Sequence, residues 1–452
     1  MKKAALIILF LVTGFGCTNF LDPEPVALLI DDLALNEAKD VPSVEIGLYG
    51  AFRGIAAPKV IAGDMTADML IHIGTFNQYR EFSNKQITST NASAAALWGS
   101  IYRTIYVANF ILEKLPGVPG VTEAERNEVT ATARFLRGYA YFVGVYTFGA
   151  MPITTTSDLE SNRNVPRSNV EDLLAFIEAD YAAASGDALP ESPVNAGFVS
   201  QSAVVAARAR LALYQQNWAE AEALTSQIID SENYTLVDDY SDIVLSDFTD
   251  EAILEVGYTV NDDPGTDANY GLNDLFRGRR EIIPSNQTVV ALNNDEAGDR
   301  FRNISFDLSE LGGVDNGWSV AKYGTADEDN NNIIIFRLGE MYLIRAEARA
   351  QQNKLFGSGS ALEDINVLRS RANGAPAVAN SKEQVLQVIE RERLYELAYE
   401  GHRWYDLVRT GRAKVVMTAF NTNWQDKFEL WPIPLREIQY NPALQGAQNP
   451  GY

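Results

Sequence analysis

Apolar side chains recur at steps of three and four residues along much of the chain, which is the spacing of one helix face. The stretch 98–112 follows this pattern and predicts a helix that ends before Pro116. Two further helices are predicted over 123–146, stopping at Gly149, and over 170–184. The pattern therefore predicts a mainly α-helical protein.

Two later segments predict helices in antiparallel pairs. In the first pair, helices over 202–214 and 219–229 are separated by the turn Gln215-Gln216-Asn217-Trp218, and alanines line the first helix. The second pair covers 338–351 and 361–371, again with alanines and a Gln-Gln-Asn turn. Two antiparallel helices in about 34 residues are the unit of the tetratricopeptide repeat. The sequence therefore predicts a tetratricopeptide-like helix-pair scaffold.

Helical periodicity fails between the two pairs, over about 231–337. Short strand-like runs at 253–258 and 333–336 alternate there with turns rich in Asn, Asp and Gly. Long loops on a rigid scaffold are a common place for binding residues. We therefore expect this irregular insertion of loops and short strands to carry the ligand-binding face.

One acidic turn in the insertion resembles the start of a calcium-binding loop. Asp327, Asp329 and Asn331 occupy the first ligand positions of such a loop, at alternate residues. However, Asn332 and Leu338 stand where the loop needs a glycine and a bidentate glutamate. We interpret the segment as a solvated acidic turn, and no metal site is predicted.

The N-terminus has the layout of a bacterial lipoprotein signal. Lys2 and Lys3 precede an apolar run over 4–12, and small residues lead directly to Cys17, the only cysteine. A charged segment, an apolar segment of about 7–15 residues and small residues at the cleavage point define a secretory signal. The alternative is an ordinary secretory signal that a cysteine happens to follow. The predicted segments are a signal peptide over 1–16, a lipid-anchored acidic spacer over 17–42 with Cys17 lipidated, and a single domain over 43–452.

Composition narrows the classes of function. Acidic residues outnumber basic ones by 60 to 37, and the formal net charge of −23 argues against nucleic-acid binding. The chain has two histidines, and it contains no nucleophile elbow, P-loop or dinucleotide motif. No catalytic residue and no cofactor are predicted. A carboxylate pair set for glycoside hydrolysis stays open as an alternative, because so many acidic residues are present.

The C-terminal third carries the most specific signal. The chain there reads Glu-Arg-Glu-Arg-Leu-Tyr-Glu-Leu-Ala-Tyr-Glu-Gly-His-Arg-Trp-Tyr-Asp-Leu-Val-Arg over 390–409, and later Leu430-Trp431-Pro432-Ile433-Pro434. Other stretches match in the same order, including Cys17-Thr18-Asn19-Phe20-Leu21-Asp22. Over nearly its whole length the chain closely resembles the SusD/RagB family of outer-membrane nutrient-binding lipoproteins. We interpret His402, Arg403 and Trp404, and likewise Trp98 and Asn109, as scaffold residues.

The resemblance implies a location, a partner and a function. A SusD-like protein is lipid-anchored at the cell outer membrane, faces the exterior and lies against a SusC-like TonB-dependent transporter. It captures oligosaccharides and delivers them to that transporter, and it is not an enzyme. Peptide capture, as in RagB-like relatives, is one alternative, and a surface glycosidase is another.

Two segments, residues 64–82 and the irregular insertion, have the composition of an oligosaccharide site. Such a site needs exposed aromatic rings that stack on the apolar faces of sugars, and polar side chains that bind their hydroxyl groups. Alternatives to ligand contact stay open for some of these residues. Tyr323 can occupy a half-buried strand position, and Arg277, Arg279 and Arg280 can lie on a solvated face. The candidate ligand-binding residues are Asp68, His72, Asn77, Tyr79, Arg80, Tyr270, Arg277, Arg279, Trp318 and Tyr323.

Overall fold

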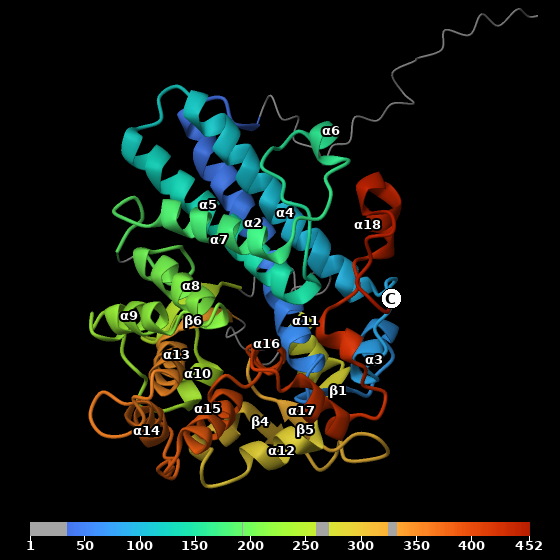
Figure 1. Cartoon of the computed structure of the whole chain (residues 1–452), viewed down its shortest axis with the longest axis vertical. Coiled ribbons are helices and arrows are strands. Elements are labelled where there is room, and N and C mark those ends of the chain that lie inside the picture. Colours follow the sequence, from blue (N-terminus) through green and yellow to red (C-terminus); the bar gives the residue numbers. More distant parts are fainter. Residues whose placement is uncertain (1–33, 192, 259–270, 324–331) are drawn as a thin grey trace, which may run out of the picture.

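The structure is a computed structural model, and it describes residues 34–191, 193–258, 271–323 and 332–452 (Figure 1). Long helices form one end of the molecule, and shorter helices with small sheets form the other (Figure 1). None of the described helices is both long and apolar enough to cross a membrane. The predictions for the signal peptide, Cys17, Tyr270 and the acidic turn at 327–331 lie outside the described residues.

Four long helices form the N-terminal part of the scaffold. Helix α4 packs against both α2 and α5, and α7 packs against α5. The side chains of Asn91, Thr122 and Asn169 accept hydrogen bonds from first-turn N–H groups, which fixes where α4, α5 and α7 begin. The three predicted helices are confirmed, and α2 is an addition. The bounds are α2 (Val41–Met65), α4 (Ala92–Lys114), α5 (Glu123–Phe148) and α7 (Val170–Ala184).

The two predicted helix pairs are also present. Helix α9 packs against both α8 and α13, so the pairs join into one stack even though the insertion separates them in sequence. Buried alanines such as Ala207 and Ala346 let the helices approach closely. The tetratricopeptide-like scaffold is thereby confirmed. The bounds are α8 (Gln201–Tyr214), α9 (Trp218–Ile229), α13 (Leu338–Gln351) and α14 (Ala361–Arg371).

The C-terminal block packs against the N-terminal part of the scaffold. The Trp431 ring stacks on Phe82 with centroids 4.5 Å apart, and its Nε1 donates a hydrogen bond to Thr66 Oγ1 at 3.0 Å. These contacts fasten the end of the chain to the N-terminal helices. His402 and Trp404 are buried, as expected of scaffold residues, and so are Trp98 and Asn109. The bounds are α15 (Lys382–Glu396), α16 (Arg403–Arg409), α17 (Ala413–Phe420) and α18 (Leu435–Tyr440).

The described strands form three antiparallel two-stranded sheets. They are β1 (Leu70–His72) with β3 (Ile282–Pro284), β2 (Ala252–Val256) with β6 (Ile333–Arg337), and β4 (Ile304–Phe306) with β5 (Trp318–Val320). The predicted runs near β2 and β6 are confirmed, and they pair with each other. Strand β1 comes from the segment between α2 and α4, so one sheet joins the insertion to the N-terminal part.

Short helical segments complete the description. Some lie within the insertion, where the periodicity of the sequence did not predict any helix. The bounds are η2 (Ala38–Asp40), α3 (Asn77–Ser83), η3 (Leu115–Gly117), α6 (Leu159–Asn162), α10 (Ser241–Leu245), α11 (Gly271–Asn273), η5 (Asp274–Gly278), α12 (Asn286–Leu292), η6 (Gly298–Asn303), η7 (Asp426–Glu429) and η8 (Pro442–Leu444).

Ion pairs buried in the interior join the insertion to the C-terminal helices. Arg337, at the end of β6, is 1% exposed, and its Nη1 lies 2.6 Å from Glu396 and 3.2 Å from Glu251. Its Nη2 lies 3.0 Å from Glu400. We call these four residues the charged core. Burial raises the pKa of Glu396, but neighbouring arginines, led by Arg371, outweigh burial and hold the pKa well below its usual range.

Glu255 on β2 is a buried carboxylic acid outside the charged core. Its Oε2 accepts hydrogen bonds from Phe248 N at 3.0 Å and Asn332 Nδ2 at 2.9 Å. Burial raises the pKa of Glu255 from 4.5 to about 7. Between these two pH values the folded state binds more protons than the unfolded state. The contribution of Glu255 to stability therefore falls as pH rises through that window.

We expect Glu255→Gln to remove this pH dependence, because glutamine keeps an acceptor oxygen and carries no charge. The variant should match the wild type near pH 4.5 and exceed its free energy of unfolding by up to about 3 kcal/mol at pH 8. Urea unfolding of both proteins at the two pH values measures the difference. If the difference in free energy of unfolding between the two proteins did not change with pH, Glu255 would not be the source of the pH dependence.

Candidate ligand-binding site

Pairing of β1 with β3 brings the two candidate segments next to each other. His72 on β1 pairs with Ile282 on β3. Just before β3, the Glu281 carboxylate accepts hydrogen bonds from the backbone N–H groups of Thr75 at 2.6 Å and Phe76 at 3.0 Å. The segment after β1 is thus fixed onto the segment before β3.

Glu281 and His72 form a buried pair at this junction. The His72 Nε2 lies 3.2 Å from Glu281 Oε2, and the two side chains are only 3% and 5% exposed. Burial raises the pKa of Glu281, but the hydrogen bonds from Phe76 and Thr75 outweigh it, and the pKa lies below 4.5. Burial lowers the pKa of His72 despite the neighbouring carboxylate. The pair therefore positions the surrounding backbone and is not open to a ligand.

An arginine and two aromatic rings gather beside this junction. The Arg279 guanidinium carbon lies 4.4 Å from the centre of the Phe76 ring, a cation–π contact. The Phe76 and Tyr79 rings meet edge to face, with centroids 6.1 Å apart. Arg279 is exposed, while Phe76 and Tyr79 are half-buried. The group therefore presents both a charge and ring surface to solvent.

Trp318 begins β5, which packs against β3. Its ring contacts Phe301 and Phe306 at centroid distances of 5.4 and 5.1 Å and stays partly exposed. Arg280 donates to Asp315 Oδ1 at 2.7 Å and to the Trp318 carbonyl oxygen at 3.4 Å. Because Arg279 and Arg280 are consecutive, the Phe76 group and the Trp318 group lie close together.

We call Phe76, Tyr79, Arg279, Arg280 and Trp318 the aromatic–arginine surface. It combines ring faces, which suit apolar patches of a ligand, with guanidinium donors, which suit hydroxyl or charged oxygens. Among the residues that the structure describes, no three His, Cys, Asp or Glu side chains gather as a metal site. The surface is thus suited to holding an amphipathic, oxygen-rich ligand by contact.

Two family models match this chain at opposite ends. Residues 309–452 match the model of the SusD family, and residues 19–213 match a model described as starch-binding associating with outer membrane. The chain belongs to the SusD/RagB family. The family resemblance predicted from the C-terminal block is therefore confirmed.

Individual SusD-like proteins align along nearly the whole chain. SusD-like protein P25 of Formosa agariphila is 25% identical, and the alignment covers 99% of each chain. The starch-binding protein SusD of Bacteroides thetaiotaomicron is 25% identical over 76% of each chain. A solved structure named as a laminarin-binding SusD-like protein has a TM-score of 0.80 at 25% identity, covering 92% of this chain and all of its own. The fold class is thereby confirmed as SusD-like.

Tyr323 was predicted as a ligand contact of this SusD-like chain, and that prediction is wrong. Its side chain is 2% exposed, and its hydroxyl donates to the Tyr399 carbonyl oxygen. The alternative of a half-buried position was nearer to the structure, because the fold encloses the Tyr323 side chain. His72 is equally enclosed, as described above, so it is not a direct ligand contact either.

Asp68 also has another role in the structure. Its carboxylate receives hydrogen bonds from Arg403 Nε at 2.9 Å and Nη2 at 3.1 Å. Its backbone carbonyl oxygen accepts from the Ser285 hydroxyl at 2.5 Å. Asp68 therefore ties the C-terminal block to the junction of β1 and β3, which is a positioning role.

The remaining described candidates lie at or beside the aromatic–arginine surface. Asn77 and Arg80 are exposed on α3, next to Tyr79, and Arg277 is half-buried on η5. These residues, with Tyr79, Arg279 and Trp318, remain predictions as ligand contacts. The sequence did not single out Phe76, and Arg280, although part of the same basic cluster as Arg277 and Arg279, was not among the candidate ligand contacts. Their places next to Asn77 and Arg279 were the available signal, but only the pairing of β1 with β3 shows that the two segments lie side by side.

Proposed function

We propose that this protein captures oligosaccharides at the cell surface and delivers them to a SusC-like TonB-dependent transporter. The aromatic–arginine surface is the observation that supports capture. It offers the partly exposed Trp318 ring near the exposed guanidinium of Arg279, and their segments are joined by the packing of β5 on β3. The relatives named for binding laminarin and starch support the same ligand class.

Capture in this proposal needs no bond breaking. Asp315, the carboxylate nearest to Trp318 in sequence, is held by Arg280 at 2.7 Å. Glu281 accepts hydrogen bonds from Thr75 and Phe76, so it too is committed to structure. A glycosidase needs one carboxylic acid that can donate a proton and a second carboxylate facing it. These two committed groups do not form such a pair, and the proposed protein is a binding protein.

The decisive experiment is a titration of the soluble chain without residues 1–17 against laminarin oligosaccharides, starch-derived oligosaccharides and short peptides. We expect saturable binding of at least one oligosaccharide, with no shortening of it in the same sample. Binding of peptides alone would favour the RagB-like alternative. Release of shorter sugars would replace the proposal with a surface glycosidase.

We further propose that the protein is anchored in the outer membrane through a lipid on Cys17, after removal of residues 1–16. The predicted signal and the family model associated with the outer membrane support this location. The thiol then has no part in ligand binding. The anchor holds the capturing domain beside the transporter.

Cys17→Ser separates anchoring from binding. The hydroxyl cannot take the thioether-linked lipid, so we expect the variant to leave the membrane fraction. Its affinity for the oligosaccharide identified in the titration should equal that of the wild type. Fractionation followed by an immunoblot measures the first effect, and calorimetry measures the second. A variant that stays in the membrane fraction would refute lipidation at this residue.

A further inference from the structure

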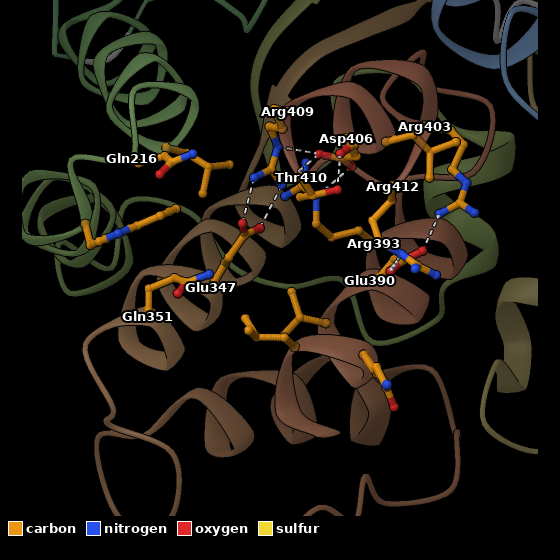
Figure 2. A pocket seen from close by; sticks show the side chains of 16 residues that line it. Gln216, Glu347, Gln351, Glu390, Arg393, Arg403, Asp406, Arg409, Thr410 and Arg412 are labelled. Carbon is orange, nitrogen blue, oxygen red and sulfur yellow. Dashed lines mark hydrogen bonds and ion pairs between the residues drawn. The ribbon is translucent and has the colours of Figure 1, made fainter. Parts of the chain in front are cut away.

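A cavity lies between the helix pairs and the C-terminal block (Figure 2). Its volume is about 460 Å³, which is in the usual range for a small-ligand pocket. Helices α8, α13, α15 and α16 supply most of its wall, and it shares no lining residue with the aromatic–arginine surface. The cavity is therefore a separate candidate site.

Ion pairs build one wall of this cavity. Arg409 donates through both terminal nitrogens to Glu347, at 2.6 and 2.7 Å, and through Nε to Asp406 at 2.9 Å (Figure 2). Arg393 donates through Nε to the other oxygen of Asp406 at 2.7 Å. Burial raises the pKa of Asp406, but Arg393 and Arg409 outweigh burial and hold it below 3.8. The wall is thus a fixed, ionised chain of alternating charges.

Two arginines of the cavity keep unused donors. The terminal nitrogens of Arg393 are buried and have no hydrogen-bond partner among the described residues. Arg412 donates through Nε to Glu390 at 3.0 Å, and its side chain makes no other hydrogen bond in the described part of the chain. With a side chain that is 45% exposed, Arg412 stands where a ligand can reach it.

The carboxylates, by contrast, are already occupied. Glu347 and Asp406 each accept from two nitrogens, and Glu390 lies within 3.7 Å of Arg403 as well as accepting from Arg412 (Figure 2). Arg403 is in turn held by Asp68. What the cavity lacks is therefore an acceptor for guanidinium groups. A carboxylate supplies one, because its two oxygens match the two parallel N–H bonds of a guanidinium edge.

We propose that this cavity binds an acidic sugar, a monosaccharide unit that carries a carboxylate. The carboxylate of the sugar pairs with the terminal nitrogens of Arg412. The buried positive charge of Arg393 also attracts this carboxylate. The amides of Gln216, Gln351 and Gln387 and the indole of Trp218 line the same cavity and suit hydroxyl groups and an apolar ring face.

Titration of the chain without residues 1–17 with sodium glucuronate, glucose and acetate tests the proposal. We expect glucuronate to bind saturably, and glucose and acetate to bind at least about tenfold more weakly, since each lacks one half of the recognised chemistry. Absence of glucuronate binding would overturn the proposal. If glucose bound as tightly as glucuronate, the role of the carboxylate would be overturned. If acetate bound as tightly as glucuronate, the role of the sugar ring would be overturned.

Matched variants locate the site. Arg412→Gln should weaken glucuronate binding about tenfold, because the exposed guanidinium edge is lost. Lys414→Gln removes an equally charged side chain that is 68% exposed and does not line the cavity, so it should leave binding unchanged. Trp318→Ala should also leave it unchanged, which separates this site from oligosaccharide capture. If Arg412→Gln and Lys414→Gln weakened glucuronate binding equally, the placement of the sugar in this cavity would be overturned.

Discussion

Replacing Arg337 by methionine is expected to lower the free energy of unfolding by about 3–5 kcal/mol. Arg337 is 1% exposed, and its guanidinium pairs with Glu251, Glu396 and Glu400. Methionine fills much of the same volume but leaves these three buried carboxylates short of a cation. Removing one partner of a buried ion pair is costly because the charges that stay behind remain out of water. Urea unfolding monitored by circular dichroism at pH 7 measures the loss.

Arg163→Met is the matched control for the charged core. Arg163 also pairs with a glutamate, Glu160, at 3.0 Å, but the two side chains are 70% and 77% exposed. Water and salt screen such a pair, so its loss should change stability by no more than about 0.5 kcal/mol. If both arginine variants lost the same small amount, the charged core would not be holding the insertion to the C-terminal helices.

Trp318→Ala is expected to weaken oligosaccharide binding about 10- to 100-fold. The variant loses the burial of one large aromatic face against the ligand, which is worth about 1.5–3 kcal/mol. Trp318 remains partly exposed while its ring packs on Phe301 and Phe306. Calorimetric titration with the oligosaccharide that binds the wild type measures the effect.

Trp318→Phe controls for the loss of packing in this experiment. Phenylalanine keeps a ring that can contact Phe306 and a sugar, so most of the affinity should remain. A thermal melt of each variant shows whether any loss of affinity reflects unfolding. If alanine and phenylalanine bind as tightly as tryptophan, Trp318 is not the platform of the site.

The sequence predicts those helices best that bury one face and expose the other. Helix α7 has the predicted bounds, because polar residues outside its buried face make the period visible. Helix α2 was missed for the opposite reason. From Ile55 to Met65 its residues are buried almost without interruption, including Lys59 and Asp64, and Pro58 lies within the helix. A helix enclosed on all sides shows no period, and a proline argues against it.

The candidate site was predictable in its parts and not in its assembly. Both segments were selected for their mixture of aromatic and polar residues. Their meeting depends on β1 pairing with β3 across more than two hundred residues, which no local pattern encodes. Tyr323 was misjudged because its burial depends on Tyr399, a distant residue whose carbonyl oxygen it binds. Long-range contacts decide which aromatic residues reach the surface.

We propose that the aromatic–arginine surface holds the oligosaccharide. Hydrogen–deuterium exchange of the chain without residues 1–17, with and without a saturating oligosaccharide, is the test of this placement. We expect slower exchange in the segments 75–80, 279–281 and 315–319, which carry that surface. Protection confined to other segments, with these three unchanged while the sugar is bound, would contradict it.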